Sequence, residues 1–208
     1  MIPIHLNPAQ VRIGLIGKGR LALRRYEWLR ARNCAPRVWT VEPDTEFEAG
    51  VEDFTAKHLP SDRDLTGLTA LWIADLDAAQ AHEVAHRARA LGILVNVEDD
   101  LPFCDFHTPA VVQREALLVS IGTGGASPAA ASYLRKILEA ALPQVWGQVL
   151  AHLGIKRLAM RENGDSPRAI LESAQTFLNT PEIVKQIAPC GRSECVLITR
   201  AKDTPAGH

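Results

Sequence analysis

Carboxylates and glycines stand at three places in this chain where their types and spacing could do chemistry. Residues 96–100 read Asn-Val-Glu-Asp-Asp after an apolar stretch, so Asp99 and Asp100 are expected where a strand ends. Residues 123–128 read Thr-Gly-Gly-Ala-Ser-Pro and precede a predicted helix. Upstream of both, residues 17–22 read Gly-Lys-Gly-Arg-Leu-Ala, a glycine turn of the kind that joins a strand to a helix in nucleotide-binding domains.

The glycine turn predicts a dinucleotide site. Gly17 permits the tight turn, Gly19 lets the backbone approach a pyrophosphate, and the small Ala22 lets helix and strand pack closely. The N-terminus of the following helix would then face the phosphates. The alternative is a glycine turn that binds nothing. The remaining residues of the predicted cofactor-binding turn are Lys18, Arg20 and Leu21.

Glu42 is the second part of the predicted cofactor site. It follows Ala22 by twenty residues and ends the second predicted strand. A carboxylate at this place can accept hydrogen bonds from both ribose hydroxyls and repels a 2'-phosphate. The pattern therefore favours NAD over NADP.

Asp99 is the first candidate for the catalytic residue. The predicted strand before it would bring it to the carboxyl edge of the sheet, where open α/β sheets bind ligands. Its carboxylate could take a proton from a substrate. The alternative is that Asp99 and Asp100 are turn residues before Pro102, since aspartate is common in turns.

The other polar side chains suggest no resident metal. His82 and His86 lie four residues apart on a predicted helix, but no third ligand accompanies them, and surface or capping positions suit them better. Cys190 and Cys195 are weak as ligands for the same reason. Most arginines of the segment 20–32 are expected on a solvated helix face, and Arg20 is the exception because it adjoins the glycine turn.

The elements that must position these residues alternate between strand and helix. Short apolar runs predict strands, helical spacing of apolar residues predicts the segments between them, and the polar segment 51–69 is expected to be irregular. Such alternation with short connections predicts an α/β fold, a Rossmann-type parallel sheet covered by helices. The predicted strands are 11–16, 37–41, 69–74 and 93–97, and the predicted helices are 20–32 and 77–91.

The pattern changes after about residue 108. Two apolar runs flank Arg114-Glu115 and predict a hairpin, and Ser127 and Pro128 are suited to begin a helix as its cap and first residue. The rest is expected to be helical except for a terminal strand. The predicted strands are 110–113, 116–121 and 194–199, and the predicted helices are 129–142, 144–161, 167–178 and 181–188.

Composition excludes several classes of protein. The 208 residues are 47% hydrophobic and 23% charged, as in ordinary globular domains, and the net charge of -1 argues against a general nucleic-acid binder. No apolar run is long enough to span a bilayer, and the first residues do not resemble a signal peptide. The four cysteines form no disulfide framework, so we expect a cytoplasmic protein with reduced thiols.

Taken together, the motifs resemble the precorrin-2 dehydrogenase / sirohydrochlorin ferrochelatase family, of the sirohaem synthase N-terminal type. The likeness covers roughly residues 2–145, and its two later motifs share spacing as well as residue type with the family. The positions that carry it are Gly17, Gly19, Ala22, Arg24-Arg25, Asn96-Val97-Glu98-Asp99, Phe106 with Pro109, and Thr123-Gly124-Gly125-Ala126-Ser127-Pro128.

The resemblance implies a reaction and an assembly. The reaction is transfer of a hydride from precorrin-2 to NAD to give sirohydrochlorin, and in some members the same pocket then takes ferrous iron as a substrate. Asp99 matches the family's acid for proton removal. The assembly is a homodimer with an NAD-binding domain at 1–108, a dimerisation segment at 109–145 and a helical domain at 146–208 over the tetrapyrrole. The residues carried over as substrate-binding are Asn96, Thr123, Gly124, Gly125 and Ser127.

Two departures from the family pattern keep two hypotheses open. The first is Lys18, which stands where the family's triplet has its middle glycine. The second lies at residues 74–82, where the family's Asn falls near Ala81 or His82. Where the family has Ala-Thr-Asp-Asp, this chain has Ala74-Asp75-Leu76-Asp77, so Asp75 adds a charge near the expected nicotinamide end of the cofactor site. Ala74 and Asp75 complete the predicted cofactor-binding set. An NAD-dependent enzyme is favoured by Glu42, Asp99 and the Gly-Gly-Ala-Ser-Pro loop. The second hypothesis is a non-catalytic relative that binds a tetrapyrrole or a nucleotide.

Overall fold

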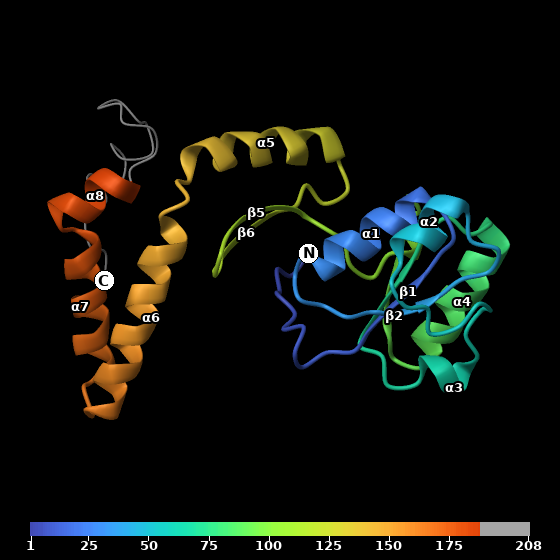
Figure 1. Ribbon diagram of the computed structural model, residues 1–208, viewed down its shortest axis with the longest axis horizontal. Helices are drawn as coiled ribbons and strands as arrows, with labels where there is room; N and C mark the ends of the chain where they lie inside the picture. The colour runs from blue at the N-terminus through green and yellow to red at the C-terminus, as the bar shows by residue number, and fades with distance from the viewer. Residues whose placement is uncertain (188–208) are drawn as a thin grey trace. The chain divides into compact units, whose positions relative to one another are not determined.

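The computed structural model of the chain describes residues 1–187 and contains two compact units, Met1–His107 and a second that begins at Thr108. In the first unit, four parallel strands form one sheet in the order β2-β1-β3-β4 (Figure 1). The predicted Rossmann-type α/β fold is confirmed. The strands are β1 (Ile13–Ile16), β2 (Arg37–Trp39), β3 (Ala70–Ile73) and β4 (Leu94–Val97).

Helices cover both faces of this sheet because its strands are apolar on both sides. On β1, Ile13 and Leu15 join the core under α1 (Arg20–Arg30) and α2 (Thr45–Gly50). Ile16 points the other way, into the core under α3 (Asp62–Leu65) and α4 (Ala78–Ala90). The sheet is therefore the middle of three layers, and the long helices α1 and α4 lie on opposite faces.

The connection after β2 is more ordered than its sequence predicts. The segment 51–69 was expected to be irregular, but it contains α3, and α2 directly precedes it. Each helix is a turn or two long and starts at a side-chain cap. Asp44 accepts from the amide of Phe47 at 2.7 Å, and Ser61 forms a capping box with Asp64. Such short helices depend on local hydrogen bonds and carry too few residues for a periodic apolar pattern.

The strand order sets where a ligand can bind. The chain passes from β1 to β2 on one side and then crosses to β3 on the other side of β1. The connections therefore leave the carboxyl ends of β1 and β3 in opposite directions, and open α/β sheets bind ligands in the crevice at such a reversal. Gly17 follows β1 at this point, and Ala74 and Asp75 follow β3.

The second unit joins a hairpin to helices. The predicted hairpin is confirmed: β5 (Ala110–Arg114) and β6 (Leu117–Ile121) pair antiparallel around Glu115, whose φ is 50°. Buried Arg114 donates to the carbonyls of Leu142 at 2.9 Å and Glu139 at 2.7 Å. The cationic side chain of Arg114 thus satisfies two carbonyls at the C-terminal end of the first helix of the second unit. The helices are α5 (Pro128–Ala141), α6 (Trp146–Glu162), α7 (Pro167–Leu178) and α8 (Pro181–Ile187).

The predicted strand 194–199 and the cysteines at 190 and 195 lie outside the described residues. Among residues 1–187, no helix is both long enough and apolar enough to cross a bilayer.

Candidate functional site

The first unit gathers most of the predicted site at one edge of its sheet. All four strands are parallel, so the residues that follow them lie along the same carboxyl edge. Gly17 follows β1, Glu42 comes soon after β2, Asp75 follows β3 and Asp99 follows β4. The predicted juxtaposition of a glycine turn with carboxylates therefore has its basis in the order β2-β1-β3-β4.

The glycine turn packs α1 directly onto the sheet. A Cβ atom on Gly17 would lie 2.3 Å from the Cβ of Ala22 and 2.7 Å from the carbonyl oxygen of Ala74. Ala22 itself is fully buried. These distances leave no room for a side chain at Gly17, and they explain why a small residue stands at Ala22.

The N-terminus of α1 receives a hydrogen bond acceptor from Asp75, in the loop after β3. Gly19 is the N-cap residue and has no side chain to offer, but Asp75 Oδ2 accepts a hydrogen bond from the amide of Ala22 at 2.9 Å. A Cβ on Gly19 would lie 3.0 Å from the same oxygen. The sequence predicts Asp75 near the nicotinamide end. The structure instead places its carboxylate at the helix N-terminus, where a pyrophosphate is expected.

The glycine turn therefore suits a dinucleotide only in part. The tight turn at Gly17 and the bare α-carbon at Gly19 are what a pyrophosphate needs in order to approach the start of α1. The carboxylate of Asp75 takes up one of the amide donors there and carries the same sign of charge as a phosphate. The backbone suits the cofactor, and the side chain of Asp75 opposes it.

The loop that carries Glu42 is joined to the glycine turn by a backbone hydrogen bond. The amide of Asp44 donates to the carbonyl oxygen of Lys18 at 2.8 Å, which ties the loop after β2 to the turn after β1. Glu42 is exposed, has a φ of 50°, and its side chain has no hydrogen bond or ion pair within residues 1–187. It is therefore free to accept hydrogen bonds from a ligand.

Three successive carboxylates follow β4, and two of them have partners. Glu98 accepts from Arg25 Nη2 at 2.9 and 3.0 Å, and Asp100 Oδ2 lies 2.7 Å from His82 Nε2. The exposed Asp99 has no side-chain partner in the described part of the chain, and its φ of 62° sets it in a tight turn. Of the three, Asp99 is the one available to a substrate.

Two of these contacts differ from what the sequence predicts. Arg25 was expected on a solvated helix face, but only 11% of its side chain is exposed, because it lies three residues after Ala22 and four before Leu29 on the packed side of α1. That spacing is a signal that could have revealed it. His82 was expected at a surface or capping position. It pairs instead with Asp100 and stacks on Phe103, with ring centroids 3.7 Å apart. No local spacing links positions 82 and 100.

Asn96, predicted to bind substrate, holds the loop after β4. It is buried and donates to the carbonyl of Phe106 at 2.8 Å and to Cys104 Sγ at 3.4 Å. The Cys104 thiol in turn donates to the carbonyl of Val97, and burial raises the pKa of this thiol above its usual value. Asn96 therefore fixes the backbone of the loop after β4, which carries Glu98, Asp99 and Asp100.

The predicted substrate loop of the second unit is a closed turn. Thr123 Oγ1 accepts from the amide of Ser127 at 3.3 Å and donates to its carbonyl at 3.1 Å. Gly124 and Gly125 have φ values of 64° and 84°, which favour glycine. Ser127 Oγ caps α5 by accepting from the amide of Ala130 at 3.1 Å. The sequence prediction of a cap at Ser127 is confirmed.

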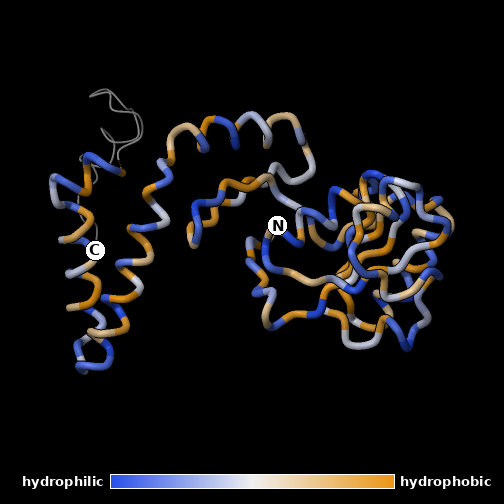
Figure 2. Tube along the Cα trace, viewed as in Figure 1, coloured by the Kyte–Doolittle hydropathy of each residue, from blue (hydrophilic) through white to orange (hydrophobic). Residues whose placement is uncertain are grey.

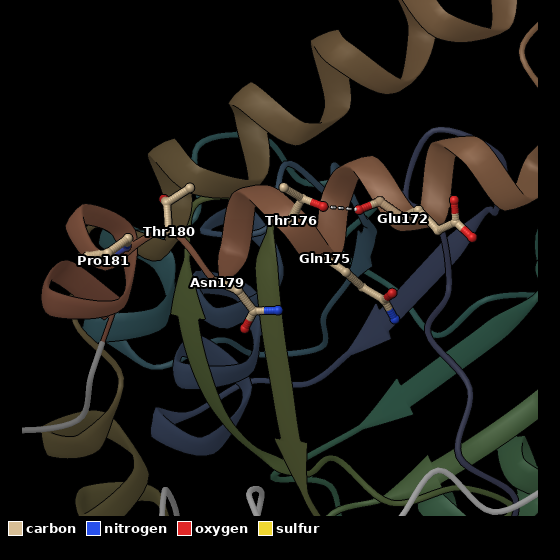
Figure 3. A pocket seen from close by; sticks show the side chains of 6 residues that line it. All are labelled: Glu172, Gln175, Thr176, Asn179, Thr180 and Pro181. Atoms are coloured by element: carbon tan, nitrogen blue, oxygen red, sulfur yellow. Dashed lines mark hydrogen bonds between the residues drawn. The ribbon is translucent and has the colours of Figure 1, made fainter.

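The second unit also carries a shallow hollow of about 590 Å³, drawn in Figure 3. It lies over the end of α7 and the start of α8, and Thr176 Oγ1 donates to the carbonyl of Glu172 beside it at 2.8 Å. None of the predicted site residues lines it. The side chains that line it are those of Glu172, Gln175, Thr176, Asn179, Thr180 and Pro181.

The fold and the glycine turn define a dinucleotide-binding α/β domain. Residues 4–110 match the family described as "Putative NAD(P)-binding", and the chain belongs to this family. The resemblance predicted from the motifs is confirmed by relatives named siroheme synthase. One from Chromobacterium violaceum is 34% identical over 155 residues, 73% of this chain and 33% of that protein. One from Pseudoalteromonas atlantica is 31% identical over 147 residues, 68% of this chain and 31% of that protein.

The chain thus spans about a third of the length of these curated relatives. Among solved structures, SirC, a precorrin-2 dehydrogenase, shares the fold with a TM-score of 0.63 at 19% identity. The match covers 88% of this chain and 92% of that one. It therefore extends beyond the parallel sheet into the second unit.

Replacing Gly17 tests the packing of the turn. Gly17→Ala should lower the free energy of unfolding by roughly 2 kcal/mol or more, because the new Cβ overlaps Ala22 and the carbonyl of Ala74. Urea denaturation measures it. Gly154→Ala is the control: its Cβ meets nothing within 4 Å, and alanine should stabilise α6 by about 1 kcal/mol. Equal stability of wild type and Gly17→Ala would contradict the packing described here.

Proposed function

We propose that the chain is an NAD-dependent precorrin-2 dehydrogenase that produces sirohydrochlorin on the way to sirohaem. The observation that carries the proposal is the single sheet edge that holds the glycine turn, Glu42 and Asp99, whose side chain has no partner within residues 1–187. The siroheme synthase relatives and the fold shared with SirC support it. Among residues 1–187, Cys34 and Cys104 are free thiols, in keeping with the cytoplasmic location we propose.

In this reaction the tetrapyrrole loses a hydride and a proton. NAD, when bound, accepts the hydride. Asp99 takes the proton, because its carboxylate is exposed at the sheet edge and no other side chain within residues 1–187 engages it. Glu98 and Asp100 are held by Arg25 and His82, so they shape the loop that presents Asp99.

Insertion of ferrous iron into sirohydrochlorin is the second activity we propose, because the relatives are named for the iron-containing product. Iron is here a substrate, and a carboxylate that removes pyrrole protons would serve both steps. Among residues 1–187, no group of three or more His, Cys, Asp and Glu side chains could hold a metal ion. The alternative function, a relative that binds a tetrapyrrole or nucleotide without catalysis, is favoured by the carboxylate of Asp75 at the start of α1.

Anaerobic incubation with precorrin-2 and NAD decides between these functions. Sirohydrochlorin should form and is followed by its absorption, with one NADH released for each molecule. Binding of precorrin-2 without turnover would reject the dehydrogenase hypothesis and support the non-catalytic alternative. Adding ferrous iron to the product then tests for the second activity.

Glu42 should set the choice of cofactor. NAD should bind more tightly than NADP, because the 2'-phosphate would meet the exposed carboxylate. Titration of each cofactor measures this through the tryptophan fluorescence of the protein, to which Trp39, three residues before Glu42, contributes. Glu42→Gln should narrow the preference, and Glu46→Gln, an equal change on α2, should keep it. Equal affinities of the wild type for NAD and NADP would refute the role of Glu42.

Asp99→Asn should lower dehydrogenase turnover by on the order of a hundredfold, the usual effect of losing a positioned base. Asparagine tolerates the φ of 62° at this position and keeps the shape of the side chain, so the variant removes only the charge. NADH release under saturating NAD measures it. Asp53→Asn, an exposed carboxylate on another loop, is the control.

The outcomes of this experiment assign the two activities separately. Full dehydrogenase activity in Asp99→Asn would reduce Asp99 to a turn residue for that step. Loss of iron insertion alone would restrict its role to the second activity.

We also propose that the chain forms a homodimer through the second unit. One side of α5 packs on the hairpin. Next to it, the helix carries three exposed apolar side chains, Tyr133, Leu134 and Ile137, with 66%, 44% and 47% of their surface accessible. Figure 2 shows hydrophobic and hydrophilic residues alternating along this helix. An apolar surface of this kind favours association.

Ile137→Asp should shift the chain from dimer to monomer, because it places a charge in the proposed interface. Light scattering should give twice 22.7 kDa for the wild type and 22.7 kDa for the variant. Ser132→Asp adds the same charge on another side of α5 and should leave the dimer intact. A wild-type monomer at micromolar concentration would rule out the dimer.

A further inference from the structure

We infer that Asp75 is a built-in competitor for the cofactor's pyrophosphate, and that it sets how tightly this domain holds a dinucleotide. The inference rests on the proposed NAD site and concerns one side chain in it. Asp75 follows β3 at the point where the connections of the sheet reverse. No other carboxylate accepts a hydrogen bond from the first turn of α1 among residues 1–187.

The first step is the hydrogen bond itself. An α-helix begins with amides that lack partners inside the helix, and these amides together with the helix dipole attract anions. In α1 the amide of Ala22 already donates to Asp75 Oδ2 at 2.9 Å. The carboxylate therefore takes up a donor that would otherwise be open to a phosphate oxygen.

The second step is the space beside Gly19. Glycine at this place removes a side chain so that a pyrophosphate can approach the backbone. Here a Cβ on Gly19 would lie 3.0 Å from Oδ2 and 3.1 Å from Cγ of Asp75. The room made by the glycine is thus filled by the carboxylate.

The negative charge of Asp75 also opposes an approaching phosphate. Asp75 has no ion pair in the described part of the chain, so its negative charge is offset mainly by the start of α1. A phosphate that approaches the same amides meets a like charge at hydrogen-bonding range. Asp75 is half-buried, so its side chain can rotate toward solvent while the backbone keeps its φ of 56°. Binding of the dinucleotide requires that rotation.

Two variants separate the charge of Asp75 from the space that it fills. Asp75→Asn keeps an oxygen acceptor for Ala22 and removes the charge, and asparagine tolerates the positive φ. Asp75→Gly also suits the positive φ and empties the space. Asp77→Asn is the matched control, because it removes an equal charge two residues away and keeps the cap that Asp77 gives to Gln80.

The experiment measures the dissociation constants of NAD and of ADP by calorimetry on the full chain, with circular dichroism to check that each variant is folded. Asp75→Asn should bind both ligands tighter by on the order of tenfold to a hundredfold, since one like charge beside a phosphate is removed. Asp75→Gly should bind at least as tightly, and Asp77→Asn should match the wild type. The gain in Asp75→Asn should shrink as salt is raised.

The outcomes separate this inference from the proposed function. If the wild type binds NAD as tightly as both Asp75 variants, the inference is overturned and the NAD site stands. If the Asp75 variants gain affinity for ADP but neither the wild type nor any variant binds NAD, the competitor role of Asp75 stands and the dehydrogenase proposal fails. If no variant binds either ligand, both are overturned.

Discussion

The close contact between Gly17 and Ala22 is the constraint on which the arrangement of the site depends. Because α1 starts against the end of β1 with no side chain between them, the helix is fixed to the sheet at its N-terminus. Buried Tyr26 and Leu29 then continue the contact along the same face. The first amides of α1 are thereby held at the carboxyl edge, and everything that competes for them must come from a neighbouring strand or from a ligand.

The packed side of α1 also reaches the far strand of the sheet. Arg25 lies on that side, and its Nη2 donates to both carboxylate oxygens of Glu98, which connects the first helix to the loop after β4. A mostly buried pair of this kind is weak evidence for stability, but it fixes where the two side chains lie. Arg25 holds Glu98 at its place in the turn, while the amide of Asn96 holds the backbone of the same loop at Phe106. The position of Asp99 is thus determined from both sides.

How far the sequence predicts this structure depends on the range of the interactions involved. The four parallel strands and the helices α1 and α4 follow from apolar runs and helical spacing, and the caps at Ser127 and Asp77 are local. The helix at α3 was missed because its capping box spans only four residues. The pairs between Asp75 and Ala22 and between His82 and Asp100 join residues 53 and 18 positions apart. No local pattern reveals such pairs, since they exist only once the strands are ordered.

The sheet edge combines the carboxylates of the predicted site with the amide donors at the start of α1. Asp75, Asp99 and Glu42 are negative and have no cationic side chain as partner within residues 1–187. Arg20 and Arg24 are exposed on α1, and Arg20 is the first residue of this helix, beside the glycine turn. These cations are absent from the ion pairs of the described residues, whereas Arg25, one position further on, is committed to Glu98. In the proposed site, an anionic ligand at the start of α1 meets the helix dipole and the neighbouring Arg20, against the carboxylate of Asp75. In the proposal made here, phosphate recognition at this edge is a balance between those groups, and it depends on whether Asp75 faces the helix or the solvent.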